Sequence, residues 1–80
     1  MELQLIDGVF KRNEIMDIIS RMIDVKINFH ADKIEKSSDE DDIKMREKKI
    51  RQLQDTMHEC RRALKDEDDI QVSARILLNA

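Results

Sequence analysis

The chain has 80 residues, of which 41% are charged and 40% apolar, and its 15 basic and 18 acidic side chains leave a formal charge of −3. This length allows one domain, residues 1–80, with a small core, in the size range where oligomerisation often supplies the missing burial. The absence of proline and the single glycine are typical of long helices, and the acidic balance argues against a strongly basic nucleic-acid binder.

The sequence shows no signal for export or for membrane insertion. Its start, Met1-Glu-Leu-Gln, lacks the basic and apolar regions of a secretory signal, and no apolar run approaches about 18 residues. The single cysteine, Cys60, excludes an intrachain disulfide and agrees with a reducing compartment. We therefore expect a cytoplasmic protein without a membrane partner.

Both ends of the chain alternate between apolar and polar residues. Residues 1–10 predict a short strand, with Leu3 and Leu5 on one side and Ile6 on the other, and Asp7-Gly8 favours a turn. Residues 70–78 are compatible with a strand or a short helix. If both ends are strands, we expect them to pair.

A long helix is expected over residues 11–36. Lys11 is a poor N-cap, which leaves Asp7 and Asn13 as alternative caps. The apolar residues of this helix form two neighbouring seams that together cover roughly 200°, about twice the stripe of a one-sided surface helix. The first seam contains Ile15, Ile18, Met22, Val25 and Phe29. The second seam contains Met16, Ile19, Ile23, Ile27, His30 and Ile34.

A second helix is expected over residues 40–65, after a loop at 37–39 in which Ser37 or Ser38 can begin a capping box. Its apolar residues keep a seven-residue repeat that suits one coiled-coil partner. The repeat contains Ile43, Ile50, Met57 and Leu64 at one position, and Arg46, Leu53 and Cys60 at the other. The short loop predicts an antiparallel hairpin in which His30 lies near Arg46 and Cys60 near Met16.

The contrast between the two helices predicts self-association. One seam of the first helix should meet the second helix, and the other should meet a second copy or another protein; the sequence leaves open which seam does which. We therefore expect a mainly α protein, a coiled-coil-like helical hairpin with short terminal strands, that dimerises into a four-helix bundle. Dimer and tetramer are not distinguished. The expected oligomer interface is Ile15, Ile18, Ile19, Met22, Val25 and Phe29.

Three polar residues interrupt or border the apolar faces near the loop, namely Lys26, His30 and Arg46. They can form a polar layer that fixes the register, or an anion site. The simpler interpretation is that the long side chains keep their charges in water.

A basic stripe on the second helix offers an alternative function, because a helical face of Lys and Arg can bind phosphates. The stripe consists of Lys44, Lys48, Arg51 and Arg62. Asp55 and Glu59 lie within or beside this stripe, and the chain has no Tyr or Trp for base stacking. Nucleic-acid binding is therefore the weaker hypothesis.

Neither catalysis nor a cofactor is expected. The chain has no Gly-rich phosphate loop and no nucleophile and base that the hairpin would bring together. The metal-binding types His30, His58 and Cys60 do not converge, and Asp39-x-Asp41 lacks the glycine of a calcium loop.

Two segments, Lys26-Ile-Asn-Phe-His30 with Lys33-Ile34 and Ile43-Lys-Met45-Arg-Glu-Lys-Lys-Ile50, resemble small bacterial helical-hairpin proteins of unknown function. The likeness covers most of the chain, including the Asp7-Gly8-x-Phe10 entry, and implies no activity, cofactor or site residue. The expected function is a non-enzymatic protein–protein interaction and oligomerisation module; the alternative is a small regulator that binds nucleic acid or another polyanion.

Overall fold

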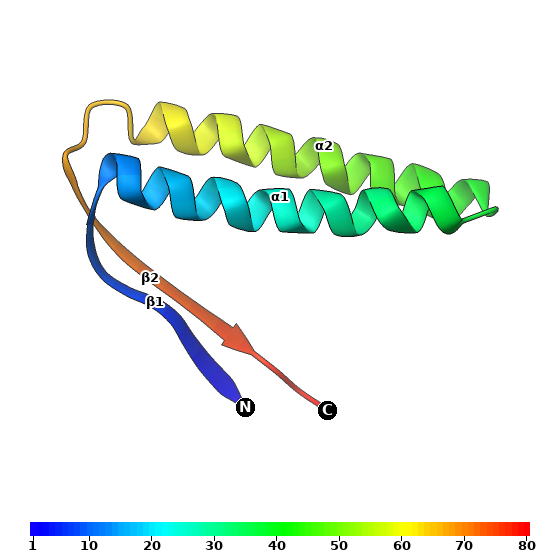
Figure 1. The fold of residues 1–80 in the computed structure, drawn as a ribbon, viewed down its shortest axis with the longest axis horizontal. Helices are drawn as coiled ribbons and strands as arrows, with labels where there is room; N and C mark the ends of the chain where they lie inside the picture. Colours follow the sequence, from blue (N-terminus) through cyan, green and yellow to red (C-terminus); the bar gives the residue numbers. More distant parts are fainter.

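The computed structural model describes residues 1–80 as a helical hairpin that carries a two-stranded ribbon. The elements follow in the order β1 (Glu2–Lys11), α1 (Arg12–Lys36), α2 (Glu40–Ala63) and β2 (Asp69–Leu77). The helices run antiparallel side by side, and the ribbon leaves the end of the pair opposite the interhelical loop (Figure 1). The predicted mainly α hairpin with paired terminal strands is confirmed.

The start of α1 is set by the end of β1. Lys11 is the N-cap residue in extended conformation, and the Glu14 carboxylate accepts a hydrogen bond from its backbone N–H at 2.9 Å. Neither Asp7 nor Asn13 caps the helix, because strand pairing continues to Lys11 and helix geometry begins at Arg12. An acid at this N3 position also complements the helix dipole.

The loop occupies residues 37–39 as predicted, but the N-cap of α2 is Asp39, not Ser37 or Ser38. The Asp39 carboxylate accepts from the backbone N–H of Asp41 at 2.9 Å, while the Ser37 hydroxyl accepts from the N–H of Asp39 at 3.2 Å. An ionised carboxylate is a strong acceptor at a helix N-terminus. Ser37 therefore orders the loop, and Asp39 caps the helix that begins at Glu40.

Helix α2 ends at Ala63, two residues before the predicted end at 65. The backbone N–H of Leu64 still donates to the carbonyl of Cys60 at 3.1 Å, but Glu67 then bonds back to the carbonyl of Leu64 and closes a turn. The acidic run after this turn would oppose the helix dipole if the helix continued.

The strands pair antiparallel from Glu2 opposite Leu77 to Lys11 opposite Asp69. The predicted turn at Asp7-Gly8 is wrong, because β1 continues through both residues and Gly8 lies opposite Val72. Gly8 has a φ of 149°, a backbone conformation that residues with a side chain rarely adopt. Glycine at this position therefore allows β1 to continue. The tail is a strand rather than a helix.

A bulge at Leu5 changes which side chains share a face. The register shifts by one residue between Gln4 and Ile6, so Ile6 rather than Leu5 joins the side that carries Leu3. The alternation predicted without a bulge is therefore wrong at this point. One side of the ribbon is nearly all apolar, and we call it the ribbon face: Leu3, Ile6, Gly8, Phe10, Ile70, Val72, Ala74 and Ile76.

The second seam of α1 faces α2, which settles the choice that the sequence leaves open. The sulfur atoms of Met16 and Cys60 lie 3.8 Å apart, and His30 bonds to Arg46, as the predicted register requires. Ile23, near the middle of this seam, is 9% exposed. The heptad of α2 is half-buried along its whole length, so the hairpin is a two-helix coiled-coil contact.

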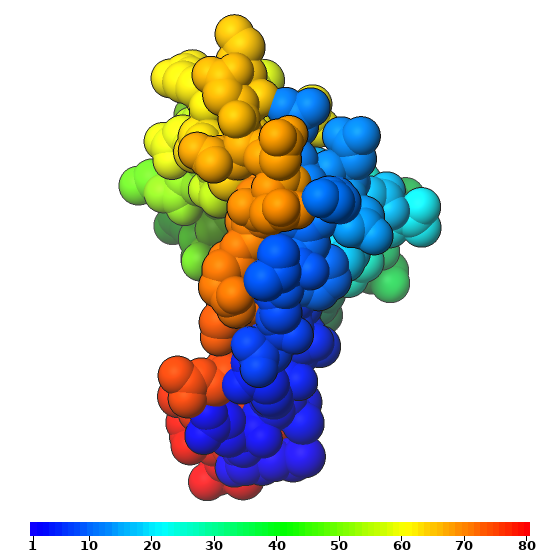
Figure 2. Space-filling view, turned by 90° about the vertical axis from the view of Figure 1, so that its left-hand side faces the viewer, coloured from blue at the N-terminus to red at the C-terminus, as the bar shows by residue number.

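The molecule is extended, with principal dimensions of 45 × 32 × 14 Å and a Cα radius of gyration of 15.2 Å. A compact chain of this length has a radius of about 12 Å. The strands contact each other and α1 but not α2, and the ribbon projects from the helices as a separate arm (Figure 2). Only Ile15 and Ile23 are buried among the 80 residues.

Candidate interaction surface

The first seam of α1 divides into a buried beginning and an exposed remainder. Ile15, where the helix leaves the ribbon, is 0% exposed, and Ile18 is half-buried. Further along, Met22, Val25 and Phe29 are exposed by 40%, 69% and 54%. Their spacing of three and four residues places these three side chains on one side of the helix, which we call the α1 flank. It is a largely exposed apolar surface, and at its loop end Phe29 contacts polar residues of both helices.

Ile19 lies between the two surfaces. It is half-buried, like the α2-facing residues of its own seam. The six residues expected at an oligomer interface are therefore not equivalent: Ile15 and Ile19 are covered within the chain, whereas the α1 flank is largely exposed.

The ribbon adds further exposed apolar surface at its free end. Ile76, Leu77 and Leu78 are all exposed, as is Met1, whose backbone pairs with Leu78. Sequence alternation could identify the apolar side of β2 but not that of β1, because the bulge at Leu5 leaves no composition signal.

Near the loop, His30 and Arg46 form a polar contact between the helices. The Arg46 Nη1 lies 3.1 Å from the His30 Nδ1, and the Arg46 Nε donates to the Asp42 carboxylate at 3.2 Å. Partial burial lowers the pKa of His30 below its usual value, and the positive charges of Arg46, Lys49 and Lys26 lower it further. Because a guanidinium can only donate, the His30 Nδ1 accepts this hydrogen bond and carries no proton, in agreement with the lowered pKa.

Phe29 on the α1 flank is bordered by the same polar cluster. Its ring meets the His30 ring edge-on at 5.4 Å, and Lys33 and Arg46 place their cationic groups 5.7 and 5.9 Å from its centroid. Lys26 is exposed and takes part in no salt bridge. Of the expected cluster of Lys26, His30 and Arg46, only His30 and Arg46 are therefore hydrogen-bonded to each other. The signal that could have revealed the Phe29 contacts is Lys33 at i+4.

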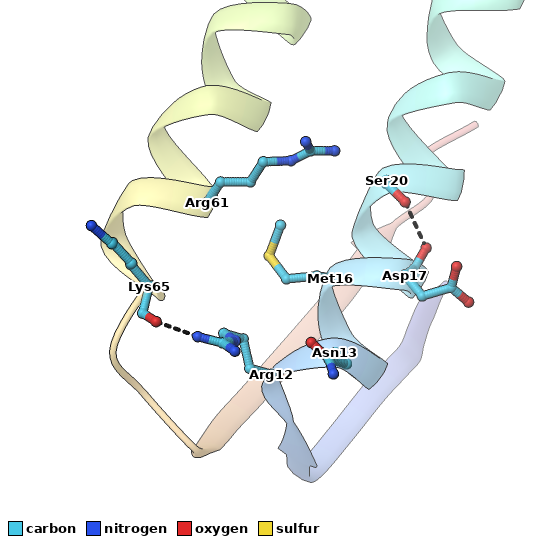
Figure 3. Close-up of a pocket in the computed structure, with 7 residues that line it drawn as sticks. All are labelled: Arg12, Asn13, Met16, Asp17, Ser20, Arg61 and Lys65. Atoms are coloured by element: carbon cyan, nitrogen blue, oxygen red, sulfur yellow. Dashed lines mark hydrogen bonds between the residues drawn. The ribbon is translucent and has the colours of Figure 1, made fainter.

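The opposite side of the hairpin is polar. A shallow hollow of about 450 Å³ lies between the start of α1 and the end of α2 (Figure 3). Arg61 reaches from α2 across Met16, while Asp17 points away and pairs with Arg21 at 3.1 Å. The seven lining residues include only one apolar side chain. The hollow is thus a solvated groove between the helices.

The basic stripe of α2 is exposed along its whole length, and none of its members takes part in a salt bridge. Its residues are Lys44, Lys48, Arg51 and Arg62. The intrachain ion pairs instead involve Lys11, Arg21, Arg46 and Arg75.

No family model, curated protein or solved structure matches this chain. No three His, Cys, Asp or Glu side chains come close enough together to hold a metal ion. Neither helix has an apolar stretch long enough to cross a membrane.

Proposed function

We propose that this chain is a non-enzymatic protein–protein interaction module that self-associates through the α1 flank. The carrying observation is that Met22, Val25 and Phe29 are exposed on one side of α1 while only two residues of the chain are buried. Adjacent exposed apolar residues of this size on a small protein are typical of an interaction surface.

The accessible surface supports an obligate partner. The chain exposes 6567 Å², whereas a compact monomer of 9.5 kDa exposes about 5,000 Å² by the usual mass scaling. The excess of roughly 1,500 Å² exceeds the ~800 Å² that each partner covers in a standard interface. If each of two copies buried this excess, the total area buried at the interface would fall within the range of obligate dimers.

The arrangement of the helices favours a second copy as the partner. If the α1 flanks of two copies pack together, both α1 helices lie inside and both α2 helices lie outside, which gives a four-helix bundle. The outer surface of α2 suits this position, because its exposed residues are almost entirely charged or polar. In such a dimer, folding and association reinforce each other.

The test uses Val25→Asp, because Val25 is 69% exposed and has no role in the intrachain helix contact. We expect sedimentation velocity to show a dimer for the unmodified chain and at least a hundredfold weaker association for the variant, since a buried carboxylate without a partner is costly. The matched control is Ala31→Asp, which introduces the same charge at an exposed position of the same helix that is neither three nor four residues from Val25. Equal association of both variants would contradict the proposed interface.

A second candidate function is polyanion binding by the basic stripe, favoured by its exposure and by its freedom from salt bridges. It predicts binding to a short labelled DNA duplex that weakens steeply with salt. Replacing Lys48 and Arg51 by Gln should reduce the salt dependence by about one unit of slope per lost phosphate contact. No retention of DNA or RNA at low ionic strength would dispose of this function.

A further inference from the structure

We propose that the outer edge of β2 pairs antiparallel with β2 of a second copy, in a register centred on Val72. This would join the two ribbons into one four-stranded sheet with the order β1, β2, β2, β1. The inference rests on the proposed self-association and specifies a second contact within the same dimer.

The hydrogen bonds at both ends of the ribbon show which backbone groups of β2 are free. Met1 and Leu78 exchange both backbone hydrogen bonds, at 2.8 and 2.7 Å, and the carbonyl of Asp68 accepts from Arg12. In an antiparallel pair these bonds recur at every second residue. The backbone N–H and C=O groups of the even-numbered residues of β2 therefore point toward β1. The N–H and C=O groups of Gln71, Ser73 and Arg75 therefore point to the outer edge.

The two edges of the ribbon differ in their fitness for pairing. The outer edge of β1 contains the bulge at Leu5 and the unusual backbone of Gly8, both of which disrupt a regular ladder. The β2 strand has nine residues without glycine, proline or bulge, and α2 does not cover it. Natural proteins protect such an edge unless it pairs with another strand.

Charge selects the register of the pair. Centring the two strands on Val72 places Asp69 of each copy opposite Arg75 of the other, and places Gln71 opposite Ser73 on the same polar side. Centring one residue later would place Asp69 opposite Leu77 and leave Arg75 opposite Gln71. Asp69 and Arg75 are both exposed, with a single intrachain salt bridge each, to Lys11 and Glu2, so they can accept a further partner. Opposite charges directly across a strand pair are stabilising.

The same register makes the ribbon face continuous across the dimer. Ile70, Val72 and Ala74 of the two copies fall on one side of the four-stranded sheet, because even-numbered residues then oppose even-numbered residues. An isolated two-stranded ribbon is marginal in water, whereas three or more strands with an apolar face are not. The proposed pairing would thus stabilise the projecting arm.

The test is a disulfide cross-link in a Cys60→Ala background. Val72 would face its own copy in a non-hydrogen-bonded pair, where Cα atoms are about 4.5 Å apart, within the range of a disulfide. We expect Val72→Cys to form a reducible dimer on mild oxidation. The control Val9→Cys, on the β1 edge, should remain monomeric on a non-reducing gel although Val9 is 63% exposed and thus readily accessible.

The result separates the two proposals because the mass of each sample is measured by light scattering before oxidation. A dimeric sample in which Val72→Cys cross-links no better than Val9→Cys would overturn the strand pairing and leave the helical interface intact. A folded monomer would overturn both.

Proline variants test the edge without cross-linking. Ser73→Pro removes an outward N–H and no bond to β1, and we expect at least tenfold weaker association with unchanged helical circular dichroism. Asp7→Pro makes the same change directly across the ribbon, on the β1 edge, and should associate like the unmodified chain. Equal association of both variants would contradict use of the β2 edge.

Discussion

The two helices are almost the same length, 25 and 24 residues, yet they use their apolar side chains differently. On α2 the apolar residues form one seam that meets α1, and Met45 is its one strongly exposed large apolar side chain. On α1 a complete seam meets α2 and three further large side chains stay exposed. The contact between the helices therefore covers nearly all the large apolar side chains of α2 but leaves three of those of α1 exposed.

This asymmetry assigns a place to each helix in an assembly. A helix with one apolar seam suits the outside of a bundle, whereas a helix with two suits its centre.

The largest effect is expected at the base of α1. Ile15→Ala should lower the free energy of unfolding by about 2–5 kcal/mol, because Ile15 is fully buried and its truncation leaves a cavity. Ile50→Ala on α2 should cost about half as much, since Ile50 is only half-buried. Urea denaturation at equal protein concentration measures both. A larger loss of unfolding free energy for Ile50→Ala than for Ile15→Ala would contradict the proposed difference between the helices.

A smaller effect is expected when exposed apolar side chains are truncated, because each helix offers one of similar exposure. Phe29→Ala on α1 should weaken self-association about tenfold or more, because a large aromatic residue buried at an interface contributes above 1 kcal/mol. Met45→Ala on α2 removes a side chain that is 44% exposed, against 54% for Phe29, and should leave association unchanged. Sedimentation equilibrium measures the association of both variants. Similar weakening in both would contradict an interface located on α1.

The smallest effect concerns pH. Because the folded chain lowers the pKa of His30, the unfolded chain binds a proton first as the pH falls through about 6.5. Stability should therefore decrease between pH 7.5 and 5.5, and His30→Gln should reduce that decrease. His58→Gln, at an exposed position on α2, should retain it. Urea midpoints at the two pH values test the difference, and an unchanged slope in His30→Gln would contradict it.

Periodicity predicted the helices and their register, since the pattern of each seam survives into the packing. The distances from Met16 to Cys60 and from His30 to Arg46 are those of the expected antiparallel pair. Periodicity could not choose between the two seams of α1, because both are apolar and both have helical spacing. The choice depends on which side the ribbon and α2 occupy, and that is a tertiary property.

The ribbon was harder to predict. Asp7-Gly8 has the composition of a turn, but cross-strand pairing with β2 keeps both residues extended. The bulge at Leu5 reverses the alternation of β1 and has no composition of its own. Local sequence therefore indicated strands at both ends but could not show which side of the ribbon is apolar or which edge is open.

The mass of the unmodified chain in solution is the most direct test of self-association through α1. Light scattering at micromolar concentration should give close to twice the 9.5 kDa of one chain, with helical circular dichroism in the same sample. A mass of 9.5 kDa for a folded, well-dispersed sample would show that α1 does not need a second copy, and would contradict the proposed function.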